Sequence, residues 1–111
     1  MAKFMVFYIS KTPASETMAN TSPEQMKASM DEWIKWKDET SKTIKVEFGM
    51  PLQPTNSISA DGVGDAHTPV SGYSILEGDK AEVIEALKKH PHLKRPDSAI
   101  ELLEFLSMPG M

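Results

Sequence analysis

The segment Lys3–Ile9 most constrains the fold, because it is a continuous β-prone run with apolar side chains on both faces. Alternate residues form the two faces: Phe4, Val6 and Tyr8 on one, and Met5, Phe7 and Ile9 on the other. The segment Ala99–Leu106 is also largely apolar on both sides. Strands of this kind have to be covered on both faces, so the fold needs a sheet with two covered faces.

Two helices are predicted. Ser22 can cap a helix with Pro23 at its first position, and Gln25 completes a capping box, so the first helix is placed at Pro23–Thr40. Asp79 starts the second helix, Asp79–Lys89, and Pro91 prevents its continuation.

The other segments follow from turn residues and alternation. Thr12–Thr21 is predicted to be a polar connector. Further strands are predicted at Thr43–Phe48, ended by Gly49 and Pro51, at Leu52–Ala60, as an irregular edge strand, and at Val70–Glu77. Asp61–Asp65 is predicted to be an exposed hairpin turn.

This order, β-α-β-(β)-β-α-β, predicts a single α+β domain over residues 1–111. Two helices can cover only one face, which favours a ferredoxin-like antiparallel sheet with two helices on one face. We expect the second face to be covered by another subunit in a homodimer.

Composition limits the partners. The net charge of -4 disfavours nucleic acid and anionic membranes as partners. The chain has no cysteine, which excludes disulfides and cysteine-ligated metals. No apolar run approaches the roughly 20 residues of a membrane span, and the first ten residues lack signal-peptide features, so a cytoplasmic location is expected.

Several short stretches together resemble the YCII-related domain family over essentially the whole chain. They are Lys3-Phe4-Met5-Val6, Met18-Ala19-Asn20, Ser22-Pro23-Glu24-Gln25-Met26, Trp33 with Trp36, Gly49-Met50-Pro51-Leu52, Gly72-Tyr73-Ser74-Ile75-Leu76, His90-Pro91-His92-Leu93, Ile100-Glu101 and Met108-Pro109-Gly110-Met111. The resemblance implies a ferredoxin-like subunit that forms a dimeric α/β barrel.

For some members the family implies lyase-type chemistry, such as dehydrochlorination, by a histidine and an aspartate. Their histidine lies on the first helix, where this chain has none. A related branch carries an Asp-Gly-Pro-Phe motif, in whose place this chain has Asp61-Gly62-Val63-Gly64.

His90 and His92 are candidate catalytic residues, since histidine is a natural general base near pH 7. Around Pro91 an extended i, i+2 pair would point its rings in opposite directions, one toward a pocket. The structural alternative is that this corner ends the helix and that a histidine cation complements the helix dipole.

Glu101 and Glu104 are candidate proton-transfer partners, because each is a carboxylate in an otherwise apolar strand. They are predicted to lie on opposite faces. The alternative is a place near a sheet end, or pairing with a lysine or a partner subunit. The spacing of His90 and His92 with a glutamate matches no established metal site, so no metal is expected.

Trp33 and Trp36 are neighbours on the first helix and pack in the core or form an aromatic wall for a ligand. Tyr73 and Ser74 would then supply polar contacts.

Asp61, Asp65 and His67 form a loose cluster that lacks the pattern of a calcium loop. The loop that carries them could act as a lid.

Three hypotheses follow. The first is a homodimeric module that binds a small apolar or aromatic-acid ligand through Trp33, Tyr73 and the His90–His92 corner. The second is a cofactor-independent lyase or isomerase, in which a histidine moves a proton with Glu101 or Glu104. The third is a dimerisation module without chemistry.

Overall fold

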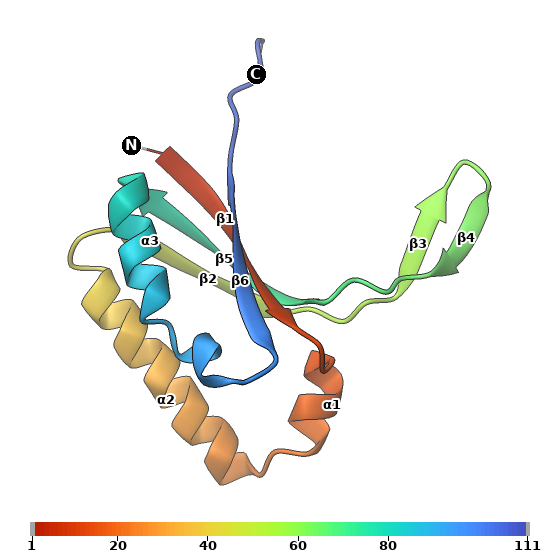
Figure 1. The fold of residues 1–111 in the computed structure, drawn as a ribbon, viewed down its shortest axis with the longest axis horizontal. Helices are drawn as coiled ribbons and strands as arrows, with labels where there is room; N and C mark the ends of the chain where they lie inside the picture. Colours follow the sequence, from red (N-terminus) through yellow and green to blue (C-terminus); the bar gives the residue numbers. More distant parts are fainter. Residues whose placement is uncertain (1, 111) are drawn as a thin grey trace.

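The structure is a computed structural model that describes residues 2–110, so Met1 and the final residue of the stretch Met108–Met111 lie outside it. Its elements follow the chain as shown in Figure 1. In order they are β1 (Ala2–Ser10), α1 (Ala14–Ala19), α2 (Pro23–Thr40), β2 (Lys45–Pro51), β3 (Asn56–Ser59), β4 (Gly62–Asp65), β5 (Val70–Gly78), α3 (Lys80–Lys88), the 3-10 helix η1 (Pro91–Lys94) and β6 (Ser98–Glu104).

Four strands form the main sheet in the order β2-β5-β1-β6, and every neighbouring pair is antiparallel. The predicted α+β class is confirmed. The strands at both ends of the chain meet here, because β1 pairs with β6 from Phe4–Glu104 to Ser10–Ser98.

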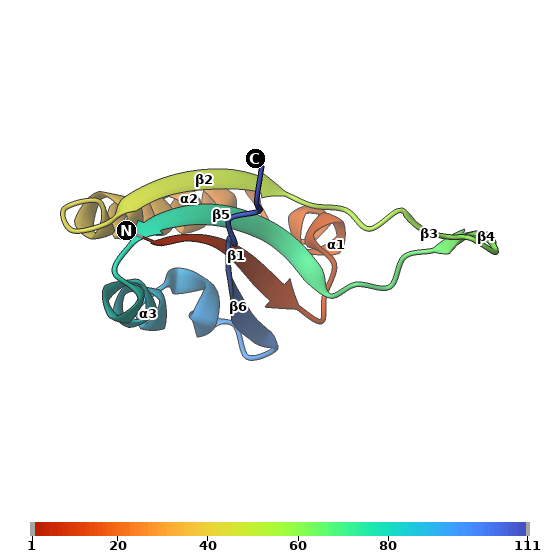
Figure 2. The ribbon, with the colours of Figure 1, turned by 90° about the horizontal axis from the view of Figure 1, so that it is seen from above.

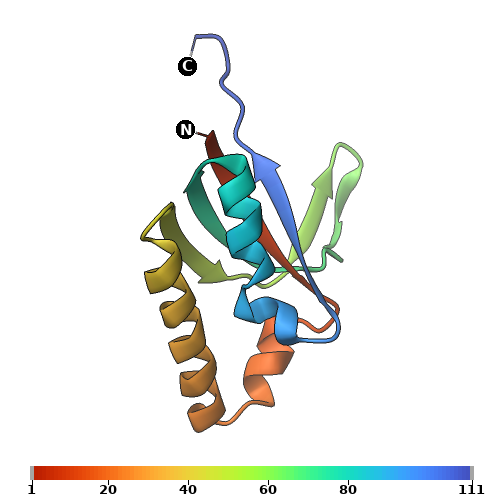
Figure 3. The ribbon, with the colours of Figure 1, turned by 60° about the vertical axis from the view of Figure 1, so that its left-hand side comes forward.

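Helices α2 and α3 lie on the same side of this sheet, in front of the strands in Figure 3. Figure 2 shows the strands following one another across the molecule, from β2 at one edge to β6 at the other. Burial follows this layering. Along β1, the side chains of Phe4, Val6 and Tyr8 are buried under the helices, and those between them are only half-buried.

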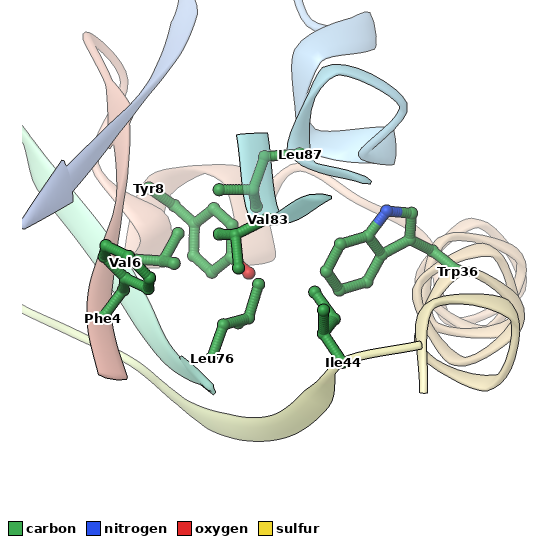
Figure 4. Packing of buried hydrophobic residues seen from close by; sticks show 8 residues of the cluster. All are labelled: Phe4, Val6, Tyr8, Trp36, Ile44, Leu76, Val83 and Leu87. Atoms are coloured by element: carbon green, nitrogen blue, oxygen red, sulfur yellow. The ribbon is translucent and has the colours of Figure 1, made fainter. Parts of the chain in front are cut away.

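The core therefore lies between the sheet and its helices (Figure 4). Its buried apolar members are Phe4, Val6 and Tyr8 of β1, Trp36 of α2, Ile44, Leu76 of β5, and Val83 and Leu87 of α3. Burying each such side chain stabilises the fold by about 1.5–3 kcal/mol relative to exposure.

Helix α2 has the predicted bounds and the predicted start. The Ser22 hydroxyl accepts from the Gln25 backbone N–H, and the Gln25 side chain accepts from the Ser22 N–H, which completes the capping box. Asp79 caps α3 by accepting from the Glu82 N–H. Both helix starts were readable from sequence because capping is a local interaction.

The other face of the main sheet carries apolar side chains, and none of the helices in residues 2–110 covers it. Met5 lies between Ile75 and Leu103, and in the next row Phe7 lies between Tyr73 and Glu101. Leu103 is 47% exposed. We call this surface the open face.

The prediction of an edge strand at Leu52–Ala60 was wrong. Strand β3 pairs only with β4, and together they form a separate hairpin that projects from the main sheet in Figure 1. Its turn is at Ala60 and Asp61, and Gly62–Asp65, which was predicted to be turn, is the second strand. Strand β2 instead runs through Gly49 to Pro51, which is tolerated because β2 is an edge strand.

Helix α1 lies within the segment that was predicted to be a polar connector. It has six residues, none of them buried. A guanidinium N–H of Arg95 donates to the Thr17 hydroxyl at 3.0 Å and joins α1 to the end of η1. A helix this short depends on tertiary contacts. Its sequence therefore lacks the helical spacing of apolar residues from which a helix is predicted. Strand β6 is shorter than predicted and ends at Glu104.

Within residues 2–110, no helix combines the length and apolar character that crossing a membrane requires.

Candidate functional site

Five ring-bearing side chains meet between the sheet and helix α2, and Ser74 lies beside them. They are Tyr8, Trp33, Trp36, His90 and His92, and we call the five rings with Ser74 the histidine–aromatic cluster. The ring centroid of His90 lies 4.4 Å from those of Trp33 and Trp36 and 4.9 Å from that of Tyr8. His90 is thus surrounded by three aromatic rings.

Local structure explains how these residues meet. Tyr8 and Ser74 lie on the helix-covered faces of β1 and β5. Trp33 and Trp36 are three residues apart and so lie on one side of α2. His90 follows the end of α3 and caps η1, which directs its ring into the same space.

His90 is held through Nδ1, which accepts the backbone N–H of His92 at 3.0 Å. Because Nδ1 accepts, the proton of the neutral ring is on Nε2. That Nε2 is buried and has no hydrogen-bond partner among the described residues. Burial, and to a lesser degree the neighbouring His92, lowers the pKa of His90 from 6.5 to about 3, so the ring is neutral near pH 7.

His92 is held by the backbone of β1. Its Nε2 donates to the carbonyl oxygen of Ile9 at 2.9 Å, since a carbonyl can only accept. Burial lowers the pKa of His92, and the bond to Ile9 opposes part of that effect. The charge of Arg95 also lowers the pKa of His92, and the charge of Asp97 raises it to a lesser degree. Asp97 is itself fixed by the Thr12 hydroxyl, which donates to its carboxylate at 3.1 Å.

Tyr8 and Ser74 share a buried hydrogen bond of 2.8 Å between their hydroxyl oxygens. Burial raises the pKa of Tyr8 to about 12, although the Ser74 hydrogen bond lowers it somewhat. The phenol therefore stays protonated at neutral pH and cannot serve as a base there.

Two predictions about the His90-Pro91-His92 corner were wrong. The rings do not point in opposite directions, because Pro91–Lys94 is a 3-10 turn and not an extended segment, and both rings contact Tyr8. A cation at the helix end is also contradicted. Both imidazoles are buried, and burial lowers both pKa values.

The remaining candidates lie elsewhere. Tyr73 is on the open face, where its ring covers Gly49. Glu101 is also on the open face, opposite Phe7, and is exposed. Glu104 is opposite Phe4, four residues along β1 from Tyr8, and is exposed near the end of the sheet. Their predicted positions on opposite faces of the strand are confirmed.

The structure therefore unites Trp33, Trp36, Ser74, His90 and His92, and leaves Tyr73, Glu101 and Glu104 apart from them. Tyr8 is the member that the sequence interpretation missed. Its signal was a phenol on the same strand face as Phe4 and Val6, since a buried tyrosine hydroxyl usually has a polar partner. Asp97 was missed as well.

The part of the chain covered by the structure contains no group of three histidine, cysteine, aspartate or glutamate residues placed to hold a metal ion.

One cavity lies away from the cluster. It has a volume of about 370 Å³ and lies at the base of the β3–β4 hairpin, and we call it the elbow pocket. Its lining comes from Ser10, Lys11, Pro13, Ala14, Gln53, Pro54 and residues 66–71. His67 of the predicted 61–67 cluster lines this pocket, whereas Asp61 lies at the hairpin turn.

No protein-family model matches this chain, and a search of curated proteins finds no match either.

Proposed function

We propose that this protein is a homodimer that binds a small molecule at the histidine–aromatic cluster. In this proposal the subunit is ferredoxin-like, two open faces pack together as in a dimeric α/β barrel, and the protein acts in the cytoplasm. The YCII-related resemblance motivates both the dimer and the barrel.

The observation that carries the ligand proposal is the Nε2–H group of His90. It is a donor with no partner among the described residues, inside a wall of Tyr8, Trp33 and Trp36. The perpendicular Trp33 ring can offer only an aromatic face or edge, which is a much weaker acceptor than oxygen. Buried donors without partners are rare in native proteins and call for an explanation. A ligand with an apolar or aromatic body and a hydrogen-bond acceptor would satisfy this donor.

The dimer is supported by the apolar open face. Met5, Ile75 and Leu103 form one continuous row across three strands. An apolar surface of this kind on a small domain is a common mark of an interface, and a two-fold dimer would cover it with a copy of itself.

A ligand screen tests the first part of the proposal. Wild type and His92→Ala would be compared by thermal shift against small apolar and aromatic-acid compounds, with Lys27→Ala, which changes an exposed residue of α2, as the control. A ligand of the cluster should raise the melting temperature of wild type and of the control but not that of His92→Ala. Binding that is equal in all three proteins would rule out the cluster as the site.

Sedimentation equilibrium tests the dimer. Leu103→Glu places a charge on the open face and should produce monomers. Ile84→Glu is the matched control, because Ile84 is an exposed apolar residue on the outer side of α3. A wild-type protein that is monomeric at all concentrations would contradict the dimer.

The lyase or isomerase alternative needs a carboxylate beside a histidine. In the single chain Glu101 lies on the opposite face of the sheet from the cluster and Glu104 lies opposite Phe4 near the end of the sheet, whereas Asp97 is the carboxylate whose charge acts on His92. A second subunit or the substrate would have to supply any further acid.

The dimerisation-only alternative is favoured by one observation, the burial of both imidazoles. It predicts a dimer for which the ligand screen finds nothing.

A further inference from the structure

The elbow pocket is formed by three separate segments. They are the end of β1 with the start of α1, the connector from β2 to β3, and the connector from β4 to β5. Each segment contributes a proline to the wall, namely Pro13, Pro54 and Pro69. Proline fixes one backbone angle, so each wall loses part of its freedom to collapse into the space. A volume of about 370 Å³ is in the range of small-ligand sites.

The charge of this pocket differs from that of the chain. The whole chain has 16 acidic and 12 basic residues, yet the lining contains Lys11 and His67 and no aspartate or glutamate. Within residues 2–110, Lys11 forms no ion pair. A fixed positive charge without a carboxylate among the lining residues favours an anionic occupant.

Uncharged donors accompany the lysine. The Thr68 hydroxyl oxygen accepts the Val70 backbone N–H at 3.3 Å, which leaves the hydroxyl proton free to donate. For the backbone N–H groups of His67 and Thr68, no acceptor is found in the described part of the chain. Gln53 adds a side-chain amide to the lining. These groups can complete the hydrogen bonding of an oxyanion.

Apart from Ser10 and Ser71, the rest of the wall is apolar, with Ala14, Ala66, Val70 and the three prolines. An inorganic anion would leave this apolar part of the wall exposed to water, whereas the body of an organic acid would cover it.

We propose that the elbow pocket binds a small organic carboxylate, with Lys11 paired to the carboxylate and the apolar wall against its body. The pocket is separate from the histidine–aromatic cluster and stands whether or not the cluster binds a ligand. None of the residues that line the pocket belongs to the cluster. The histidine of the pocket is His67, whereas those of the cluster are His90 and His92.

Benzoate and benzamide are the probes, because they match in shape and differ in charge. Each would be titrated into ¹⁵N-labelled protein at constant ionic strength while the backbone amide signals are followed. Benzoate should shift the signals of Gln53, His67 and Thr68 saturably, and benzamide should bind at least about tenfold more weakly. Lys11→Gln should weaken benzoate binding about tenfold, and Lys11→Arg should retain most of it.

Lys27→Gln is the matched control, since it removes an exposed lysine from α2. It should leave benzoate binding unchanged. Equal binding of benzoate and benzamide, no loss in Lys11→Gln, or no saturable shift at all would each overturn the proposal. Shifts centred on Trp33 and His92 would assign benzoate to the cluster instead, which would support the proposed function and refute the elbow site.

Discussion

The backbone N–H of His92 donates to Nδ1 of His90 at 3.0 Å, and this one bond sets both the local fold and the protonation state. It caps the 3-10 turn Pro91–Lys94, as a side-chain acceptor does at a helix start. It also leaves the ring proton on Nε2, which points to no acceptor among the described residues. His90 thus follows the end of α3, caps the start of η1 and presents the unused donor of the cluster.

His90→Ala should destabilise the protein by about 3–4 kcal/mol, because it leaves a cavity between two indole rings and removes the cap of η1. Urea unfolding followed by tryptophan fluorescence measures the change. His67→Ala removes an exposed imidazole and should change the free energy of unfolding by no more than about 0.5 kcal/mol. Equal effects in both variants would show that His90 has no packing role.

Stability should fall as the pH is lowered from about 6.5 toward about 3. The pKa of His90 is 6.5 when unfolded and about 3 when folded, so in this window the unfolded chain binds the extra proton. The contribution of neutral His90 to the free energy of unfolding is therefore complete above pH 6.5. It is lost on acidification, by at most about 1.4 kcal/mol per pH unit. His92, whose pKa is also lowered, acts in the same direction.

Urea midpoints measured at several pH values between about 7 and 4.5 test this dependence. His90→Asn keeps an acceptor at the cap and cannot titrate, so its stability should vary less steeply with pH than that of wild type. Parallel slopes for the two proteins would mean that His90 is not neutral in the folded state.

Tyr8→Phe and Ser74→Ala should each cost about 1–2 kcal/mol, because each leaves one buried hydroxyl without its partner. The double variant removes both hydroxyls together and should cost less than the sum of the single changes. Chemical denaturation of the four proteins gives the coupling energy. Strict additivity would mean that the 2.8 Å contact contributes nothing to stability.

Trp36→Phe should cost about 1–3 kcal/mol, because the indole N–H of Trp36 donates to the Ala86 carbonyl in the last turn of α3 at 2.9 Å. Trp33→Phe is the comparison, since Trp33 is half-buried and its indole N–H has no hydrogen-bond partner within residues 2–110. Its loss should be the smaller of the two in thermal unfolding. The reverse order would show that ring size at Trp33 outweighs the Ala86 bond.

Ser22→Ala should destabilise the protein by about 1 kcal/mol, because it removes the acceptor of the Gln25 N–H at the start of α2. Ser29→Ala, in the exposed middle of the same helix, should be neutral or slightly stabilising. Thermal unfolding with circular dichroism compares the two variants. A loss at Ser29 that matches the loss at Ser22 would remove the case for the capping box.

Local signals predicted most of the elements. The capping residues Ser22 and Asp79 and the alternation of Lys3–Ile9 act over a few residues, so helix starts and strand faces were readable directly. Helix α1 and the β3–β4 hairpin were not, because their positions depend on contacts such as Arg95 with Thr17 and on a pairing partner that the local pattern does not name.

By itself, the sequence determined the α+β class, the two main helices and the candidates Trp33, Trp36, Ser74, His90 and His92. Only the tertiary structure decided which candidates meet. The antiparallel pairing of β1 with β6 put Glu101 on the open face, and the 3-10 turn brought both histidine rings to Tyr8. Register and turn geometry depend on partners that are distant in the chain. A shift of the register by one residue moves a side chain to the other face of the sheet.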